Sequence, residues 1–387
     1  MGSARWQLVA DAVARLGELV PDGDPVGEQY LLRFLGAGIR NCIELDDTVS
    51  PHLGRSIEHR LTWGLDNPDC TYRYTRLDPA GTYLVSGTVG TTKHLELQVN
   101  TGHQGDGNFA GWKAVSTLTK DELDIGPGGD IGVVLSAAVP PKGVDWLSLT
   151  PEASFLLVRE YTSDWAGEEP ASLLIERIDR PLPPAPLTAP DFDARVALLV
   201  QWLDVGARCW DSISRGILEG AVGDIQPFLP PASASGQKGQ AYGMGSWRCE
   251  PDEALVIRLH PPACRYWSVS LCDEWWQSID AAERQSSLND AQAACGPDGS
   301  VTMIVAHEDP GVQNWLDPGG RTSGTIAVRY LLLDDPDAGL PVARIRRARL
   351  ERSSTPLPPS AGPPVSPSAR VDALRDRHRA YLARLKW

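Results

Sequence analysis

The sequence predicts a mainly β protein with two β-sandwich-like domains, a helical lead-in, a connecting helix and a C-terminal helix. Two regions, 60–182 and 240–335, contain short runs rich in β-branched and aromatic residues, such as TYLVSGTV and YWSVSL. The 37 glycines and 32 prolines punctuate these runs as turn formers do. A chain of 387 residues is too long for one small hydrophobic core and suits two domains.

Helical spacing of apolar residues flanks the two β regions. In the lead-in, residues 1–59, Leu8, Val9, Val13 and Leu16 repeat at helical intervals before PDGDP interrupts them. The connecting segment, residues 190–220, is amphipathic and interrupted by glycine. Residues 353–387 begin as a proline-rich linker and end in a basic helix, RVDALRDRHRAYLARLKW.

Charge and composition exclude several classes of protein. A net charge of −14 disfavours a sequence-independent grip on nucleic acid, which demands clustered Lys and Arg. No run approaches the roughly 18 to 20 apolar residues that cross a bilayer, so we expect no membrane span. The lead-in lacks the apolar centre of a signal peptide, and the seven cysteines contain no CxxC pair. We therefore expect a cytoplasmic protein.

Motifs for metals and nucleotide cofactors are missing from the sequence. It contains no HExxH, no GxGxxG after a strand and no GxxxxGK[ST]. Asp46 and Asp47 form an acidic pair that Mg²⁺ could use, although capping of the next turn explains the pair as well. We expect no bound metal and no cofactor.

Motifs in both β regions resemble a known family. PDEALVI, YWSVSL, SLND and DPGVQNWLDPGG are similar to the family called domain of unknown function 1214. GLDNPDCTYRYTRLDP resembles the N-terminal module often fused to that domain. Together the two resemblances cover roughly residues 60–335 and imply a two-domain, sandwich-rich architecture. They supply no activity.

The DNPD motif holds the first candidate residues. Turn formation alone explains an Asn-Pro pair between two acids. In the functional interpretation, Asp66 or Asp69 is a general base whose pKa is raised by burial. Asn67 and Tyr72 would then contact the substrate, and Tyr74 would donate a hydrogen bond.

A second set of candidates follows the NWLD motif. Asp317 and Arg329 could face each other as a bidentate pair, in which Arg329 binds a substrate carboxylate or sulfate and Asp317 orients it. Asn314 and Trp315 would line the same place, although Asp and Asn beside Gly and Pro often cap turns. His307 is the histidine best placed for proton transfer, with a surface turn as its alternative.

Aromatic residues of the second β region predict an apolar pocket between the β domains. Core packing is the alternative explanation for the same residues. The predicted wall comprises Tyr242, Trp247, Trp267, Trp276 and Trp315, with Arg284 and Asn289 as polar tips.

The resulting hypothesis is a cofactor-independent enzyme that acts on a hydrophobic small molecule by acid–base chemistry. Steroid, terpenoid or acyl substrates and a hydrolase, lyase or isomerase reaction would suit the predicted pocket. The alternatives are a non-catalytic binding protein for such a molecule and an interaction scaffold. An enzyme requires an ionisable group with a perturbed pKa in the pocket, whereas a binding protein does not. A homo-oligomer is also expected, because a partner often covers exposed strand edges in β-sandwiches.

Overall fold

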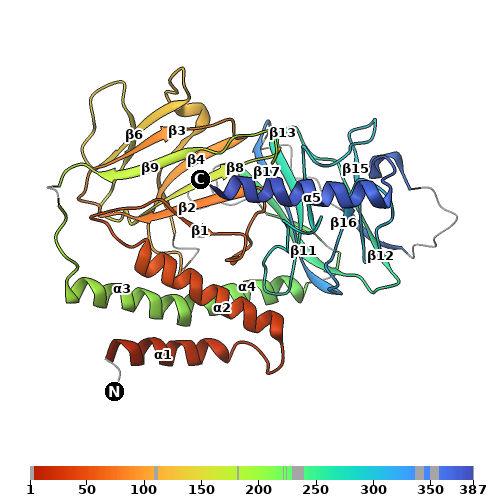
Figure 1. The fold of residues 1–387 in the computed structure, drawn as a ribbon, viewed down its shortest axis with the longest axis horizontal. Coiled ribbons are helices and arrows are strands. Elements are labelled where there is room, and N and C mark those ends of the chain that lie inside the picture. Colours follow the sequence, from red (N-terminus) through yellow and green to blue (C-terminus); the bar gives the residue numbers. More distant parts are fainter. Residues whose placement is uncertain are drawn as a thin grey trace.

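The computed structural model describes residues 4–108, 112–180, 183–220, 222–223, 225–228, 239–335, 344–348 and 357–386. The described residues form four β-sheets, arranged as two β units with helices at both ends of the chain and between the units (Figure 1). The predicted mainly β fold with two sandwich-like domains is confirmed. The start of the predicted proline-rich linker, residues 353–356, lies outside the described residues.

The first β unit packs a five-stranded sheet against a four-stranded sheet. The first sheet has the order β1 (Gly54–Ile57), β2 (Cys70–Arg76), β8 (Phe155–Tyr161), β4 (His94–Asn100) and β5 (Ala114–Thr119). The second has the order β7 (Asp145–Ser148), β6 (Asp130–Ser136), β3 (Tyr83–Thr88) and β9 (Ser172–Arg177). Alternate apolar residues, among them Leu95, Leu97, Val133 and Val158, form the core of this unit.

The second β unit repeats this arrangement. Its five-stranded sheet has the order β10 (Gln226–Phe228), β11 (Gln240–Arg248), β17 (Ser323–Leu333), β13 (Cys264–Cys272) and β14 (Ser287–Asn289). Its four-stranded sheet has the order β16 (Trp315–Leu316), β15 (Val301–Ala306), β12 (Ala254–Leu259) and β18 (Arg344–Ala348). Strand β1 begins before residue 60 and β18 follows residue 335, so the sheets extend past the ranges expected from the sequence.

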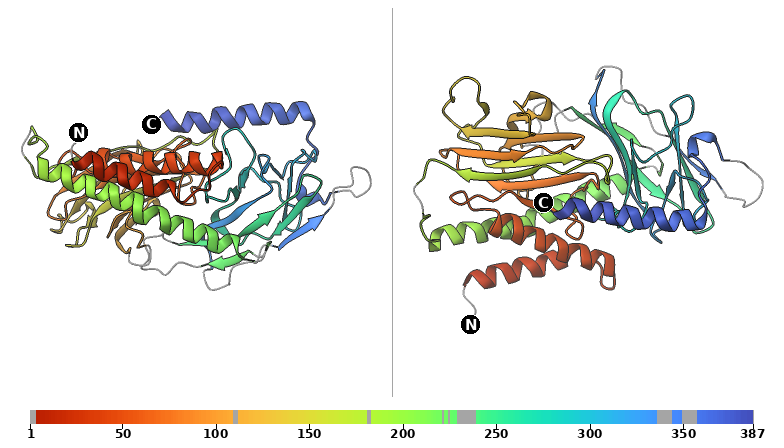
Figure 2. Two further views of the ribbon diagram at one scale, coloured as in Figure 1. Left: turned by 90° about the horizontal axis from the view of Figure 1, so that it is seen from below. Right: turned by 45° about the horizontal axis from the view of Figure 1, so that its top comes forward.

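Helices cover one side of the first β unit (Figure 2). They are α1 (Ala4–Gly17), α2 (Pro25–Ile39) with the π-helical turn η1 (Arg40–Glu44), α3 (Ala189–Gln201), η4 (Trp202–Gly206) and α4 (Ala207–Leu218). Helix α2 begins at Pro25, where Asp24 accepts hydrogen bonds from the backbone of Val26 and Gly27. Helix α4 contacts β11 and β17 of the second unit, and its Cys209 Sγ donates to Gly107 O in a loop of the first unit at 3.3 Å, so the connecting helices reach both β units.

The C-terminal helix α5 (Pro367–Ala383) lies along the second β unit, and its end approaches the first (Figure 1). Short 3₁₀ turns occur at η3 (Lys120–Glu122), η5 (Pro359–Ala361) and η6 (Arg384–Lys386). In the described part of the chain, no helix combines the length and the apolar character needed to cross a membrane.

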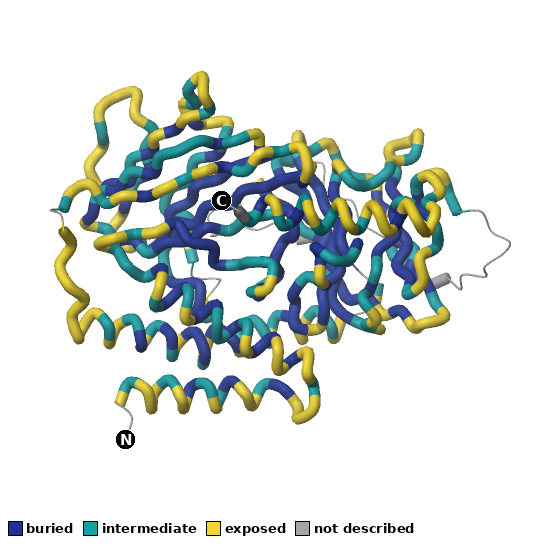
Figure 3. Tube along the Cα trace, in the orientation of Figure 1, coloured by how far each residue is buried: buried dark blue, intermediate teal, exposed yellow. Residues whose placement is uncertain are grey.

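The central strands of the five-stranded sheet in the first unit are buried on both faces. All residues of β4 and β8 are buried, and the dark central strands in Figure 3 show this. One face of β4 presents Leu95 and Leu97 to the core, while the opposite face presents Glu96 and Gln98, which are 0% and 1% exposed. A polar face therefore lies inside the protein, next to the second β unit.

Candidate functional site between the two β units

The DNPD turn of the first unit lies against strand β17 of the second. Arg329 Nη2 donates to the carbonyl oxygens of Leu65 at 2.8 Å and Asp66 at 3.2 Å. Leu65 and Trp276 have φ angles of 57° and 59°, in the left-handed region, and Leu65 N donates to Trp276 O at 2.9 Å. Non-glycine residues in this region carry strain, which in folded proteins often marks functional sites.

The carboxylate of Asp69 accepts hydrogen bonds from both units. Its carboxylate accepts from Tyr266 Oη at 2.7 Å, Trp165 Nε1 at 2.7 Å and Asn289 Nδ2 at 2.8 Å. Asn67 Nδ2 donates to the same Tyr266 hydroxyl oxygen at 3.1 Å. Burial raises the pKa of Asp69, and these donors partly oppose the rise.

Asp66 is buried beside this network and is held by the second unit. Its carboxylate accepts from the backbone N–H and the hydroxyl of Ser278, and burial raises its pKa. Donors of the protein itself thus engage both Asp66 and Asp69. This arrangement gives the two acids a positioning role in the turn, and the general-base role stays a prediction.

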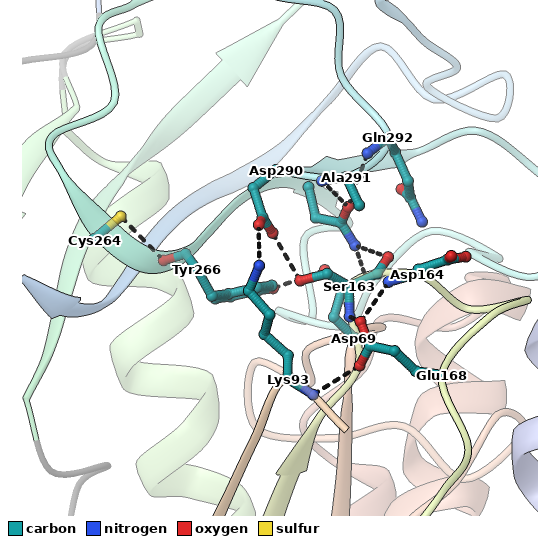
Figure 4. Close-up of polar contacts among 11 residues, drawn as sticks. Asp69, Lys93, Ser163, Asp164, Glu168, Cys264, Tyr266, Asp290, Ala291 and Gln292 are labelled. Carbon is teal, nitrogen blue, oxygen red and sulfur yellow. Dashed lines mark hydrogen bonds and ion pairs between the residues drawn. The ribbon is translucent and has the colours of Figure 1, made fainter. Parts of the chain in front are cut away.

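A further network joins loops of the first unit to the edge of strand β14 (Figure 4). Asn289 Nδ2 also donates to Ser163 O at 3.0 Å. Asp290 accepts from Lys93 Nζ at 2.9 Å and from Ser163 Oγ at 2.7 Å. These buried and half-buried contacts fix the position of one β unit relative to the other.

Two tyrosines and two arginines meet beside the DNPD turn, and we call them the inter-unit cluster: Tyr72, Arg159, Tyr242 and Arg329. Tyr72 and Arg159 are register partners on β2 and β8, as Tyr242 and Arg329 are on β11 and β17. The charge of each arginine acts on both phenols. The cluster therefore takes one tyrosine and one arginine from each β unit.

The two arginines differ in their partners. Arg159 Nη1 donates to Glu96 Oε1 at 2.9 Å and Gln98 Oε1 at 3.1 Å. Arg329 is only 2% exposed, and its Nη1 has no hydrogen-bond partner among the described residues. A buried donor without a partner is rare in native proteins and requires an explanation.

The phenols of the cluster are half-buried and neutral. Burial raises the pKa of Tyr72 and Tyr242, and the arginine charges oppose that rise only in part. Tyr242 Oη donates to Gln240 Oε1 at 2.8 Å. Each phenol therefore keeps its single O–H proton at neutral pH, and Tyr242 donates its proton to Gln240.

The NWLD segment takes a different position from the one expected. Asp317 accepts from Arg284 Nη1 at 2.8 Å and from Gly319 N at 2.7 Å, so it closes its own turn. Arg329 instead bonds the DNPD turn, and the predicted Asp317–Arg329 pair does not form among the described residues. The reason is the topology, because β16 joins the four-stranded sheet while Arg329 projects from the other sheet toward the first unit.

Three other candidates from this region have structural partners. His307 Nε2 lies 3.0 Å from Cys249 O, in a turn between strands. Asn314 is buried and bonds the backbone of Ala294 and Ser360. Trp315 Nε1 donates to Ala306 O at 2.8 Å.

The predicted aromatic wall is divided among separate hydrophobic clusters. Trp247 and Trp267 belong to the core of the second unit, Trp315 to a cluster with Ile304, and Trp276 to one with Leu65. Tyr74 packs against Phe155, with ring centroids 5.3 Å apart. Core packing explains these residues, whereas Tyr242 lies in the inter-unit cluster.

Sequence reasoning missed Arg159, Glu96 and Gln98 in the polar face, and Trp165 and Tyr266 around Asp69. The available signal was the polar alternation in HLELQVN and the arginine inside the otherwise apolar FLLVREY. Such alternation usually indicates a strand with one solvent-exposed face, which is why it did not suggest a site.

The acidic pair Asp46 and Asp47 contacts protein groups. Asp46 Oδ1 lies 2.8 Å from Arg76 Nε, and burial raises the pKa of Asp46 to about 6. Asp47 accepts from the backbone of Val49 and Ser50. Within the described ranges, no group of three or more His, Cys, Asp or Glu could hold a metal ion.

A family model matches part of the chain, and one solved structure agrees with this architecture. Residues 252–331 match the family described as "Protein of unknown function (DUF1214)". The crystal structure of an uncharacterized protein from Burkholderia cenocepacia is similar, with a TM-score of 0.81 and 30% identity over 89% of this chain and 96% of that chain. The VPA0106 protein from Vibrio parahaemolyticus shares 11% identity over 89% of this chain and 100% of that chain, with a TM-score of 0.44. No curated protein matches the sequence.

The fold and the site define a class of protein with two β units joined by a buried polar cluster. Within that class, the chain belongs to the DUF1214 family, as its motifs predicted.

Proposed function

We propose that the chain binds a small organic molecule at the inter-unit cluster. The observation that supports this most is the position of Tyr72 and Tyr242, which are half-buried beside two buried arginines at the junction of the β units. Ligand sites occur preferentially at such junctions, where a few polar groups converge among apolar surfaces.

Burying the two arginines of the inter-unit cluster costs free energy that an apolar junction would not cost. Taking a guanidinium out of water costs several kcal/mol unless a partner compensates, and apolar residues would pack the same junction at lower cost. The strained backbone at Leu65, whose carbonyl accepts from Arg329, adds to that cost. A binding role gives both features a reason to be present.

The ligand that suits these side chains has an apolar body and at least one polar end. The ring faces of the two tyrosines provide apolar contact, and their hydroxyls donate hydrogen bonds, that of Tyr242 in exchange for its bond to Gln240. A hydrophobic small molecule of steroid, terpenoid or acyl type meets this description.

A cofactor-independent acid–base enzyme is the second candidate. Its support is the Tyr72 phenol, because the charges of Arg329 and Arg159 act against the rise in pKa that burial causes. These charges oppose the rise only in part, so the pKa of Tyr72 stays well above its ordinary value, whereas the best proton donor has a pKa near the working pH. Asp66 and Asp69 are less suited, since their oxygens already accept hydrogen bonds.

Native mass spectrometry of the purified protein, before and after mild denaturation, tests for a retained molecule. In parallel, ligand-observed NMR with a panel of aliphatic and aromatic fragments tests binding to wild type and to the double variant Tyr72→Ala, Tyr242→Ala. Arg248→Ala on the exposed end of β11 is the matched control. We expect binding that the double variant loses and the control keeps.

Two results would overturn the proposal: no binding of any fragment together with no retained molecule, or equal binding by the double variant. Conversion of the bound molecule over time would favour the enzyme, and unchanged recovery would favour the binding protein.

A cytoplasmic location and a homo-oligomer stay predictions, and light scattering measures the oligomeric state.

A further inference from the structure

We infer that the molecule bound at the inter-unit cluster carries one carboxylate, which Arg329 attracts and the Tyr72 hydroxyl binds, and which the Tyr242 hydroxyl binds in exchange for its bond to Gln240. This inference rests on the proposed function and specifies the chemistry of its ligand. It follows from a difference between the two arginines: a carboxylate of the protein hydrogen-bonds Arg159, and none among the described residues hydrogen-bonds Arg329.

Arg329 hydrogen-bonds neutral carbonyl groups, whereas Arg159 hydrogen-bonds a charged carboxylate. The Nη2 group of Arg329 bonds two carbonyl oxygens, those of Leu65 and Asp66, and Nη1 is buried without a partner among the described residues. Arg159 bonds the carboxylate of Glu96 at 2.9 Å. One guanidinium of the cluster is therefore neutralised by direct contact and the other is not.

The groups around Arg329 do not supply the missing contact. The Asp66 carboxylate acts on Arg329 through its charge, but its oxygens accept from Ser278. The thiols of Cys70 and Cys272 have pKa values raised by burial, so they are neutral near pH 7. Within the described ranges, no carboxylate of the protein hydrogen-bonds Arg329.

The neighbouring donors favour a singly charged, oxygen-rich group. Tyr242 lies opposite Arg329 in the β11–β17 register, and Tyr72 interacts electrostatically with the same guanidinium. Charge-assisted hydrogen bonds from phenols and a guanidinium to a carboxylate are stronger than those to a neutral oxygen. Arg159 hydrogen-bonds the Glu96 carboxylate, whereas the Asp66 charge acts on Arg329 without a hydrogen bond to it. One guanidinium therefore lacks a directly bonded anion, and this favours a monoanion over a phosphate dianion.

Titration calorimetry with two matched pairs of probes tests the inference on the full-length chain. The pairs are decanoate with 1-decanol, and naphthalene-2-carboxylate with 2-naphthalenemethanol. In each pair the apolar body is the same and the acidic group is replaced by a neutral hydroxyl. We expect the acid to bind at least about tenfold more tightly than the alcohol in one pair or both, as expected for a hydrogen bond to a charged group.

Variants assign the preference to the cluster. Arg329→Gln should reduce the affinity for the acid to that for the alcohol, while Arg248→Gln on the same sheet should preserve the tenfold ratio. If Arg329→Gln does not fold, the double variant Tyr72→Phe, Tyr242→Phe replaces it, because it keeps both rings and removes both hydroxyls. Its acid-to-alcohol ratio should then fall several-fold.

The outcomes separate the two proposals. Equal binding of acid and alcohol to wild type would overturn the carboxylate and leave the proposed binding function intact. A full acid preference in both cluster variants would overturn the assignment to this site. If none of the four probes binds, the proposed function fails, and the inference fails with it.

Discussion

Removing the Asp69 carboxylate should weaken the contact between the two β units more than any single surface change. Asp69 is 1% exposed and accepts hydrogen bonds from Trp165 of the first unit and from Tyr266 and Asn289 of the second. Asp69→Ala leaves these three donors buried without an acceptor. Deletion of one partner from a buried charged network costs about 3–5 kcal/mol, so we expect a loss of about 4 kcal/mol in the free energy of unfolding.

Asp69→Asn should destabilise the protein less than Asp69→Ala does. Its Oδ1 can still accept from Trp165 and Asn289, and its Nδ2 can donate to the Tyr266 hydroxyl, which then acts as an acceptor. Only the strength added by the negative charge is lost, so we expect about 1–2 kcal/mol. The exposed Asp124→Ala should change stability by less than about 0.5 kcal/mol.

Urea unfolding followed by tryptophan fluorescence and far-UV circular dichroism measures these changes. Because Asp69 lies between the units, the Ala variant should also separate a single transition into two, with one unit unfolding before the other. A loss below about 1 kcal/mol for Asp69→Ala, or an Asn variant less stable than the Ala variant, would refute the reasoning.

Two further predictions concern a buried acid and a close backbone contact. Burial raises the pKa of Asp273 from 3.8 to about 6. Between these two pH values the folded protein holds a proton on Asp273 that the unfolded chain has released. The stability that this group contributes therefore falls as the pH rises from about 4 to about 6. Asp273→Asn has no group that titrates at this position, so its free energy of unfolding relative to wild type should change by up to about 3 kcal/mol between pH 4 and pH 6. A difference between variant and wild type that does not depend on pH would contradict the raised pKa of Asp273. Gly87 has a φ of 142°, and a Cβ there would lie 1.9 Å from Ser172 O, so Gly87→Ala should cost more than about 2 kcal/mol in thermal unfolding. Gly132→Ala on the neighbouring strand, where a Cβ has no neighbour within 4 Å, is the control and should cost less than about 1 kcal/mol; equal losses would disprove the steric argument.

Local patterns in the sequence were sufficient for the fold class. Period-2 runs bounded by glycine and proline predicted sheets, and the runs TYLVSGTV and YWSVSL contain β3 and most of β13. The residues of the DNPD motif were also sufficient to mark a turn. These predictions succeed because turn formation and strand alternation depend on neighbours in the chain.

The partners of the candidate residues could not be predicted in the same way. Arg329 bonds the carbonyl oxygens of Leu65 and Asp66, which lie 264 and 263 residues away in sequence, whereas the expected partner Asp317 is close to it in the chain. Contacts of this kind depend on how two complete units pack. No local spacing encodes them.

The C-terminal helix shows the same limit. The sequence predicted a basic helix there without partners for its charges, whereas Arg377 and Arg384 both lie over the ring of Trp165, at 4.3 and 4.6 Å from its centroid. Arg384 Nη2 also donates to Pro68 O at 2.6 Å, within the DNPD turn. The C-terminal segment is therefore part of the folded structure that holds the turn.

A crystal structure of the protein with naphthalene-2-carboxylate is the measurement that tests the central claim most directly. The account predicts density for the probe between strands β2 and β11, with a carboxylate oxygen within hydrogen-bond distance of Tyr72 or Tyr242 and its charge directed at Arg329. Density for the probe at the outer surface, or within either sandwich core, would contradict a binding site between the two β units.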